Sequence, residues 1–548
     1  GLESGRLDLE GPLSRKVSKD TKVPRLFSGL WLRVFDKSAC LRQEVDVNAL
    51  MFLRQLLVIG KRIETDCTYD RLIAKVGEYH DIERSLRKPS FTWECDYFRP
   101  RECDGSPNGG LSTGDLCLNG SDHGDYHLPL GIVSEETTEL EDANHHSYRG
   151  DDLSSSLQRV HLVQAVDYVH PSISSQPCLF RMEMSRSDQE RKVEDIRLLN
   201  QIQQVADLIF SSFAEFDADL YSDQMFESGR GSGFKHGPGA VAERLKNWEK
   251  SQFPNWPHKL EGRFPFRVCG TTAGSGKPQP RNHEVASRLI AVPKTAKGPR
   301  LIAAEPTSHQ WCQQLLLSFL FNQCRATFGT HFIDFKDQQK SGDMVLKASL
   351  DRELATVDLS DASDRLTCWT VERIVRSNPS LLTALHAART RYIRDEISND
   401  VSFLSLRKFA SQGTATTFPI MSLVMLCIAL GVSLDSKHGV TWGSIRDLRG
   451  KVRVFGDDII IPRHGYERLV RAMDLLQLKV NLAKSYVNGH FRESCGTDGF
   501  RGYDITPVKP RTLVADSPAS CQAVVDTSNN LFNKGYWNAS STVESLLP

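Results

Sequence analysis

The chain of 548 residues lacks several features that would identify its class at once. Lys+Arg and Asp+Glu both number 68, so the net charge is zero and gives no sign of a polyanionic partner. The 13 cysteines include no CxxC pair. Their closest set, Cys95, Cys103 and Cys117, matches no common zinc spacing. We therefore expect free thiols in a reducing compartment.

Three further absences concern targeting, membranes and phosphate loops. Gly1 is not an initiator methionine and no signal peptide follows it, so we expect a fragment or a processed product. Residues 409–434 carry no charge, but polar residues in the first half leave too short an apolar run for a membrane span. We expect a buried helix there and no membrane partner. The GSGK segment at 274–277 lacks the first Gly of a phosphate loop, and Pro278 replaces its Ser or Thr.

The length predicts several lobes or a large multi-part enzyme. Residues 104–158 are rich in Gly, Ser, Asp, His and Glu and are expected to form a polar surface insertion. Hydrophobic periodicity and turn residues predict helices over residues 196–216, 310–328, 419–434 and 466–478, a strand over 354–359 and a loop over 228–240.

The most informative segment is VRVFGDDIII at residues 452–461. Its β-branched and aromatic flanks predict two strands, and Gly456, Asp457 and Asp458 predict the turn between them. An ordinary acidic hairpin turn is the alternative. However, two like charges at the rim of a core raise each other's pKa unless a cation offsets them. Carboxylate oxygens suit Mg²⁺ or Mn²⁺.

A second acidic strand end, ATVDLSDASD, lies upstream. Ser360 and Asp361 can be explained as caps of a following helix. Asp358 lies inside the predicted strand, where a carboxylate is costly unless it is solvated, paired or bound to metal. If this strand and the strand of Asp457 and Asp458 are neighbours, three carboxylates can hold two divalent ions about 3.5–4 Å apart.

Two more segments favour phosphate binding. Residues 288–300 alternate apolar residues with cations, including Arg288, Lys294 and Arg300, and can lay positive charge along a triphosphate. A solvated basic surface is the alternative. Residues 411–419 combine Gly with small hydroxyl residues, so a nucleotide or template can approach closely, and the helix that follows presents its N-terminus there. The alternative is a plain buried helix with a polar entry.

In this order, the segments resemble the RNA-dependent RNA polymerases of single-stranded RNA bacteriophages, the levivirus-type replicases. The matching segments are residues 294–306 for motif F, 358–364 for motif A, 413–422 for motif B, 455–461 for motif C, 481–484 for motif D and 491–496 for the segment after it. The resemblance covers roughly residues 281–510. Five motifs in the right order are far more specific than any one of them.

The resemblance implies metal ligands and a proton donor. Asp358, Asp457 and, less directly, Asp458 would bind two Mg²⁺ ions, with Mn²⁺ as the alternative metal. Lys484 would be the general acid for the leaving pyrophosphate, because a Lys beside a triphosphate can donate both charge and a proton.

The resemblance also implies contacts to nucleotide and template. Lys294 and Arg300 would contact the incoming triphosphate, and Gly413 and Thr417 would line the template and nucleotide site.

Sugar selection is assigned less sharply. Many RNA polymerases read the sugar hydroxyl with an Asp five residues after the first Asp of motif A. Ser363 stands at that position here and Asp364 follows, so the role stays open between them. Ser422 is a further candidate for sugar selection.

The implied fold is an α+β right-hand polymerase with an antiparallel palm sheet packed on helices. We assign residues 1–190 to an N-terminal region associated with the fingers, 191–350 to the fingers, 351–510 to the palm with a fingers insertion at 366–410, and 511–548 to the start of a truncated thumb. Such an enzyme copies RNA from NTPs in the cytoplasm of a bacterial host. The family works with host translation elongation factors and a ribosomal protein as subunits.

Two other classes of function remain open. An RNA-templated DNA polymerase would share the carboxylates, but the Gly before the Asp pair and the phage-like motif A argue against it. An inactive RNA-binding relative is disfavoured because all three carboxylates are present.

Overall fold

The computed structural model describes residues 1–7, 16–18, 20–61, 63, 67–90, 186–253, 255–270, 280–281, 284–295, 298–398, 401–435 and 439–548. The predicted insertion at 104–158, the closest cysteine set and the GSGK segment lie outside these residues. Within the described part, nine cysteines are free. No helix of that part combines the length and apolar character needed to cross a bilayer.

A three-stranded antiparallel sheet of order β11–β12–β7, here named the carboxylate sheet, carries both acidic segments. Its strands are β7 (Leu354–Val357), β11 (Arg453–Phe455) and β12 (Asp458–Pro462). The predicted hairpin is confirmed, but Asp458, which was predicted in the turn, is the first residue of β12 and pairs with Phe455. β12 also pairs with β7, and Ile459 lies opposite Val357. Continued by one residue, this register places Asp358 and Asp458 side by side at one end of the sheet.

The predicted strand over 354–359 is interrupted at Asp358. Beyond it, β8 (Leu359–Ser360) leaves the carboxylate sheet and pairs with β13 (Lys479–Val480). The backbone N–H of Asp358 donates to Ser485 Oγ at 3.4 Å instead of to a neighbouring strand. The break therefore frees the acidic residue from the regular ladder.

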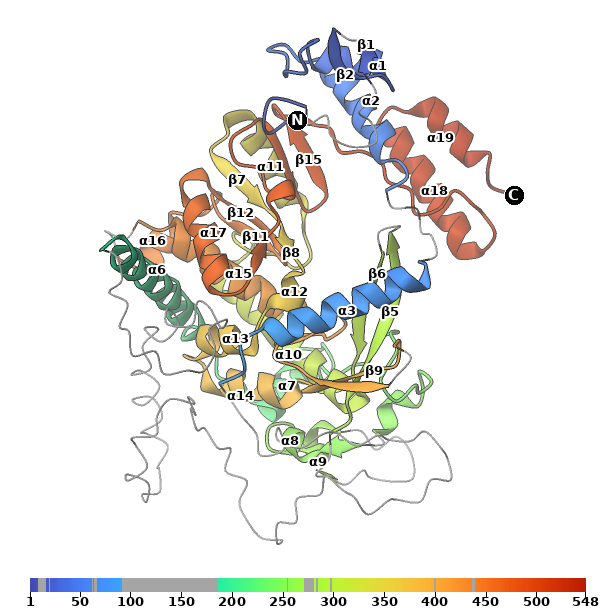
Figure 1. Ribbon diagram of the computed structural model, residues 1–548. Coiled ribbons are helices and arrows are strands. Elements are labelled where there is room, and N and C mark those ends of the chain that lie inside the picture. Colours follow the sequence, from blue (N-terminus) through green and yellow to red (C-terminus); the bar gives the residue numbers. More distant parts are fainter. Residues whose placement is uncertain are drawn as a thin grey trace, which may run out of the picture.

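The helix α15 (Thr417–Ser433) lies behind the carboxylate sheet and confirms the predicted buried helix (Figure 1). All of its residues except Phe418 are buried. It packs against α6 (Arg186–Phe210) and α17 (Tyr466–Leu475). A Cβ added at Gly431 would lie 2.9 Å from Ile202 Cα, so glycine allows this close crossing of α15 and α6.

The first predicted helix, over 196–216, differs from α6 at both ends. α6 starts ten residues earlier, in a charged segment that carries no apolar periodicity. It ends at Phe210 because the Asn378 side chain donates to the backbone carbonyls of Phe210, Phe213 and Ala214. A partner 168 residues away in the chain therefore sets the helix end.

A four-stranded mixed sheet of order β10–β9–β5–β6 forms the lower part of the molecule in Figure 1. Its strands are β5 (Ser287–Thr295), β6 (Gly298–Ala304), β9 (Tyr392–Asp395) and β10 (Ser402–Ser405). β5 pairs with β6 antiparallel and with β9 parallel. The helix α3 (Tyr69–Ser85) runs along β6 (Figure 1). The basic segment is thus a strand hairpin covered by an N-terminal helix.

The remaining elements surround these two sheets. Helices before residue 300 are α1 (Ser28–Val34), α2 (Val47–Val58), α7 (Ala218–Glu227), α8 (His258–Glu261) and α9 (Phe266–Cys269). Later helices are α10 (Thr307–Phe328), α11 (Gln339–Asp351), α12 (Ala362–Arg365), α13 (Cys368–Val375), α14 (Pro379–Ala388), α16 (Trp442–Arg446), α18 (Pro518–Asn533) and α19 (Trp537–Glu544). The other strands are β1 (Lys16–Ser18), β2 (Thr21–Pro24), β3 (Trp256–Pro257), β4 (Pro280–Arg281), β14 (Phe491–Ser494), β15 (Thr497–Phe500) and β16 (Tyr503–Asp504). Short 3₁₀ turns are η2 (Lys250–Gln252), η3 (Arg463–Gly465) and η4 (Leu482–Lys484).

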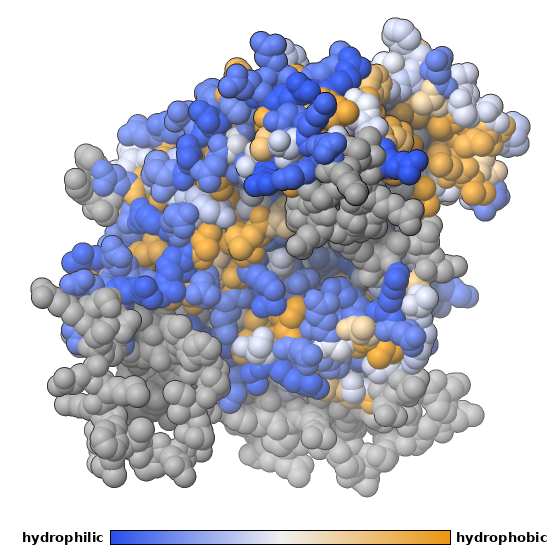
Figure 2. Space-filling view, turned by 45° about the horizontal axis from the view of Figure 1, so that its top comes forward, coloured by the Kyte–Doolittle hydropathy of each residue, from blue (hydrophilic) through white to orange (hydrophobic). Residues whose placement is uncertain are grey.

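Segments from both ends of the chain meet in a separate group of helices, α1, α2, α18 and α19, at the upper right of Figure 1. The rings of Phe52 on α2 and Tyr536 beside α19 lie 5.7 Å apart. Figure 2 shows apolar side chains gathered on this part of the surface, where Phe532 and Trp537 are exposed.

Candidate active site

A cavity of about 860 Å³ lies between the carboxylate sheet, the β5–β6 hairpin and α3. It brings together nine of the twelve residues predicted from the sequence, which come from segments far apart in the chain. These are Lys294, Arg300, Asp358, Ser363, Asp364, Gly413, Thr417, Asp457 and Lys484. Three predicted residues, Arg288, Ser422 and Asp458, are not among the side chains that line it.

Asp358 is held by the segment that follows β13. Its Oδ2 accepts hydrogen bonds from Asn481 Nδ2 at 2.9 Å and from Lys484 Nζ at 3.0 Å. The backbone N–H of Asn481 also donates to the Asp358 carbonyl at 2.9 Å. The carboxylate and the predicted proton donor are therefore already in contact.

The turn that carries Asp457 is positioned by Ser422. Gly456 has φ +65°, a conformation that favours glycine, and its N–H donates to Ser422 Oγ at 2.9 Å. Ser422 Oγ in turn donates to the Phe418 carbonyl at 2.7 Å, inside α15. Ser422 is fully buried, so the structure places it as a link between α15 and the acidic turn and does not bring it to the cavity.

The three carboxylates differ in their surroundings. Burial raises the pKa of Asp457, and the nearby charge of Asp358 raises it further. Burial, and then the charge of Asp457, raise the pKa of Asp458 to about 7. The backbone amide of Cys495, in the turn between β14 and β15, acts in the other direction and lowers the pKa of Asp458. Asp358 and Asp457 thus face the cavity, while Asp458 faces the neighbouring hairpin.

The donor chemistry at this end of the sheet fits a hard divalent cation. Asp358 and Asp457 supply oxygen ligands that repel each other without one. As the side chains stand, no three His, Cys, Asp or Glu of the described residues converge on a common metal position. Asp358 is instead paired with Lys484. Asp358 and Asp457 are the residues that would hold such a cation.

Three cations lie opposite these carboxylates. Lys294 is on β5, Arg300 on β6 and Lys484 in η4. Burial lowers the pKa of Lys294, and the charges of Arg300 and Lys484 lower it further. Although burial lowers the pKa of Lys484, its hydrogen bond to Asp358 and the charge of Asp358 raise it overall. The cations are thus close enough to act together on one anion.

Arg288 lies at the other end of β5, opposite Ala304. Burial lowers its pKa, and the charged groups that act on it are Arg244, Glu396 and Arg394. None of these side chains lines the cavity. The structure therefore separates Arg288 from Lys294 and Arg300, although all three share one basic segment in the sequence.

The loop before α15 is fixed to the end of β6. Buried Glu305 accepts hydrogen bonds from Thr414 Oγ1 at 2.8 Å and from Gln313 Nε2 at 3.0 Å. The backbone N–H of Ala303 donates to the Gln412 carbonyl at 2.7 Å. Gly413, between Gln412 and Thr414, has φ +105°, and a Cβ there would lie 2.2 Å from the Ala303 carbonyl oxygen. Glycine is therefore required both by the conformation and by the contact.

Replacing Gly413 with alanine is expected to displace this loop and to lower the free energy of unfolding by about 1–3 kcal/mol. Gly450→Ala is the matched control, since Gly450 has φ +72° with no atom within 4 Å of an added Cβ. Denaturant midpoints of both variants separate the clash from backbone strain. Equal effects of the two substitutions would contradict this account.

The two candidates for sugar reading are placed differently. Ser363 is 3% exposed and lines the cavity, and its Oγ has no hydrogen-bond partner among the described residues. Asp364 accepts a hydrogen bond from Lys408 Nζ at 3.0 Å. Lys408 is fully buried, lies 3.4 Å from the ring centroid of Tyr79, and is 3.5 Å from Glu83 Oε2. Asp364 is thus committed to an ion pair, whereas Ser363 retains an unused hydroxyl.

Sequence reasoning missed Lys408 and the residues of α3. Tyr79 Oη is 2.9 Å from Ser411 Oγ, so α3 contacts the loop before α15 directly. Arg407 and Lys408 stand together between Leu406 and Phe409, and nothing in the local sequence shows which of the two cations is buried. No sequence signal marks Tyr79 either.

The raised pKa of Asp458 predicts a pH dependence of stability in the metal-free chain. The folded chain keeps the proton on Asp458 up to a pKa of about 7, whereas the unfolded chain loses it at about pH 4. The stability that this carboxyl group contributes is therefore fully present below about pH 4 and is lost as the pH rises toward 7. We expect Asp458→Asn to remove on the order of 2–4 kcal/mol of this pH dependence. Urea unfolding between pH 4.5 and 8 measures it, with exposed Asp223 on α7 as the matched Asn control. Parallel pH profiles of wild type and Asp458→Asn would contradict the prediction.

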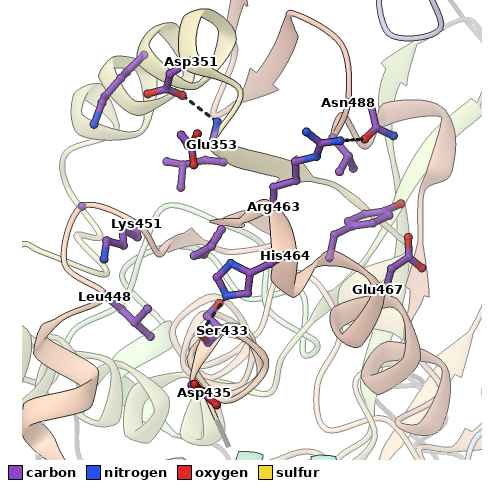
Figure 3. A pocket seen from close by; sticks show the side chains of 16 residues that line it. Asp351, Glu353, Ser433, Asp435, Leu448, Lys451, Arg463, His464, Glu467 and Asn488 are labelled. Carbon is purple, nitrogen blue, oxygen red and sulfur yellow. Dashed lines mark hydrogen bonds between the residues drawn. The ribbon is translucent and has the colours of Figure 1, made fainter. Parts of the chain in front are cut away.

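A larger cavity, of about 1070 Å³, lies at the opposite end of β7 and β12, beside Leu354 and Pro462 (Figure 3). It contains none of the predicted site residues. Several of its polar groups bond one another: Arg463 donates to Asn488 Oδ1 at 2.7 Å, and Asp351 accepts from the Glu353 N–H at 2.9 Å (Figure 3). Size therefore does not identify the active site here, whereas the facing carboxylates and cations do.

The chain folds as an α and β protein with mixed and antiparallel sheets. Its cavity places carboxylates opposite cations at the ends of strands. Residues 269–524 match the family described as RNA replicase, beta-chain. The resemblance to the levivirus-type polymerases is therefore confirmed for this region.

Named relatives agree with the family match. The RNA-directed RNA polymerase beta chain of Enterobacteria phage fr is 29% identical over 272 residues, 49% of this chain and 43% of the relative. The RNA-directed RNA polymerase subunit beta of Escherichia virus Qbeta is 31% identical over 257 residues, 46% of this chain and 40% of the relative. The chain thus spans less than half the length of the curated relatives it matches.

Among solved structures, the BmCPV RNA-dependent RNA polymerase at elongation state aligns with a TM-score of 0.38 and 10% identity. The alignment covers 62% of this chain and 31% of the other chain. A likeness of this size carries no argument about the fold.

Proposed function

We propose that this chain is the catalytic part of an RNA-directed RNA polymerase that replicates a phage genome from NTPs. The observation that carries the proposal is the cavity in which Asp358 and Asp457 face Lys294, Arg300 and Lys484. Carboxylates for metal and cations for a triphosphate are the two halves of a nucleotidyl-transfer site. The match of residues 269–524 to the replicase family supports it.

In the proposed reaction, a 3′-hydroxyl, or that of an initiating nucleotide, attacks the α-phosphate of an NTP and pyrophosphate leaves. Two Mg²⁺ ions, when bound, would activate the hydroxyl and neutralise the developing charge. Asp358 and Asp457 would hold them, with Asp458 as a supporting group. Lys294 and Arg300 would orient the triphosphate, and electrostatic stabilisation of this kind supplies much of the rate gain.

Lys484 fits the part of proton donor to pyrophosphate. Its raised pKa keeps the proton on Nζ at neutral pH. Its ammonium group lies 3.0 Å from the Asp358 carboxylate and lines the cavity in which the triphosphate would bind. The same residue would then neutralise Asp358 before substrate arrives and act on the leaving group afterwards.

We assign the carboxylate sheet and its helices, residues 351–510, to the palm, and residues 191–350 to the fingers. The segment 366–410 joins the fingers, because β9 and β10 pair in the sheet of β5 and β6. Residues 511–548 would begin the thumb. The contact of α3 with β6 supports our assignment of the N-terminal region, residues 1–190, as associated with the fingers.

For sugar selection we propose Ser363. Its buried and unpartnered hydroxyl lines the cavity, whereas Asp364 is paired with Lys408. Ser363→Ala is expected to reduce the preference for NTPs over dNTPs by about three- to tenfold through the loss of one hydrogen bond. The ratio of kcat/KM for NTP and dNTP measures it, with Ser360→Ala, at another hydroxyl of the cavity, as control. A larger loss of preference in the control would refute the assignment.

The function is tested by template-directed incorporation on single-stranded RNA with Mg²⁺. The full chain is supplied with NTPs or with dNTPs, alone and with host elongation factors and a ribosomal protein, because we propose these as partners in the bacterial cytoplasm. Incorporation of NTPs is the expected result. Incorporation of dNTPs alone would establish an RNA-templated DNA polymerase. RNA binding without incorporation in any arm would establish an inactive relative.

A further inference from the structure

The helix α3 forms a wall of the candidate cavity, although it lies outside residues 269–524, the region that matches the replicase family. Its cavity-lining residues follow the spacing of one helical face and are Arg71, Ala74, Lys75, Glu78, Tyr79 and Ile82. The helix contacts β6 and α12, so one face borders both the basic hairpin and the end of the acidic segment. None of the roles proposed above uses its two cations.

The cations of α3 lie in a different part of the cavity from those assigned to the triphosphate. The charges that act on Lys294 and Lys484 include both Asp358 and Asp457. For Lys75, burial lowers the pKa, while Glu78, Asp361 and Asp364 raise it overall. Lys75 therefore lies near Asp361 and Asp364, in agreement with the contact between α3 and α12.

The pairing of Lys75 leaves it available to a stronger anion. Its ion pair with Glu78 is a local i,i+3 pair on the same helix, with side chains 38% and 50% exposed. Exposed pairs of this kind contribute little stability, so a phosphate can displace Glu78. Arg71 is one helical turn away on the same face. Two cations separated by one helical turn can each bind one of two neighbouring phosphates along a polyanion.

The C-terminal half of α3 is fixed by contacts to other segments, so the helix holds Arg71 and Lys75 on a rigid support. Tyr79 is 3% exposed and bonds Ser411 through its hydroxyl. Glu83 accepts the backbone N–H groups of Arg407 and Lys408. In Figure 1 the other end of α3 points toward the group of α18 and α19.

We propose that Arg71 and Lys75 bind backbone phosphates of the single-stranded RNA template as it enters the cavity. The inference rests on the proposed function. A nucleoside triphosphate is the other source of phosphate, but Lys294, Arg300 and Lys484 already surround the carboxylates where it would react. Phosphate contacts of this kind position a strand without reading its sequence.

The test measures RNA binding by the full chain, without NTPs, over a series of salt concentrations. Arg71→Gln and Lys75→Gln are each expected to weaken the affinity for a labelled single-stranded RNA about three- to tenfold. Each should also reduce the slope of log affinity against log salt by about 0.7, the value for one lost phosphate contact to a single strand. Arg84→Gln is the matched control, since Arg84 lies on α3, is exposed and does not line the cavity.

The outcomes separate the inference from the function on which it rests. Weaker RNA binding with an unchanged KM for NTPs supports the template contact. A raised KM with unchanged RNA binding assigns the cations to the triphosphate and overturns it. The template contact is also overturned if neither RNA binding nor KM changes, or if Arg84→Gln changes RNA binding equally. In both cases, nucleotide incorporation by the wild type would still support the polymerase function. Wild-type protein that neither binds RNA nor incorporates nucleotides would refute both.

Discussion

Replacing Asp457 with asparagine is expected to reduce nucleotide incorporation by at least about 10³-fold while leaving the chain folded. Asn keeps the shape of the side chain and removes the charge that would hold a divalent ion. In the metal-free chain the same change should raise stability. Burial and the charge of Asp358 raise the pKa of Asp457, so its ionised form costs free energy in the folded state at neutral pH.

Opposite effects on activity and stability are the distinctive feature of this prediction. Single-turnover incorporation and the urea midpoint at pH 8 without metal measure the two quantities. Asp223→Asn, at an exposed carboxylate on α7, should change neither. Incorporation by Asp457→Asn within about tenfold of wild type would show that this carboxylate does not hold the metal. A parallel loss of stability and activity would show instead that Asp457 supports the fold.

Replacing Lys408 with methionine is expected to lower the free energy of unfolding by about 3–5 kcal/mol, because it leaves buried carboxylates without their cation. Lys408 and Glu83 are 0% and 1% exposed, and Asp364 is 17% exposed. Methionine preserves much of the volume, so packing changes little. Chemical denaturation measures the loss. Activity should fall as well, since the same ammonium group joins α3 to the segment of Ser363 and Asp364.

A compensating variant tests the electrostatic cause. The triple change Lys408→Met, Glu83→Gln and Asp364→Asn removes all three charges and should recover most of the lost stability, because neutral replacement of a whole buried ion cluster is often tolerated. Discrimination between NTPs and dNTPs should remain altered in the triple variant if the cluster positions Ser363. A triple variant no more stable than Lys408→Met would attribute the loss to packing instead.

Local patterns predicted the elements that carry the site. The hairpin of β11 and β12 and the helix α15 follow from β-branched runs, a turn with a central Gly and an uncharged apolar segment, which are properties of contiguous residues. The break at Asp358 was not predicted, because it depends on Ser485, which is 127 residues away in the chain. The end of α6 was missed for the same kind of reason, a distant contact from Asn378.

The candidate site divides in a similar way. Asp358, Asp457, Lys294, Arg300 and Lys484 were predicted from their chemistry and order, and the fold brings all five to one cavity. Ser422 and Arg288 were also predicted from their segments, residues 413–422 and 288–300, but neither lines this cavity. Side-chain direction depends on strand register and helix rotation, which a motif does not contain.

The sequence by itself thus determined the carboxylates, the basic segment and the buried helix that follows the Gly413 loop, because composition and periodicity act over short stretches of chain. The tertiary structure alone decided that α3 closes the cavity, that Lys408 pairs with Asp364, and that Ser363 keeps an unpartnered hydroxyl. Tyr79 and Ser411, which meet at 2.9 Å, are 332 residues apart. Contacts over such separations are selected by packing of the whole chain, and no local pattern encodes them.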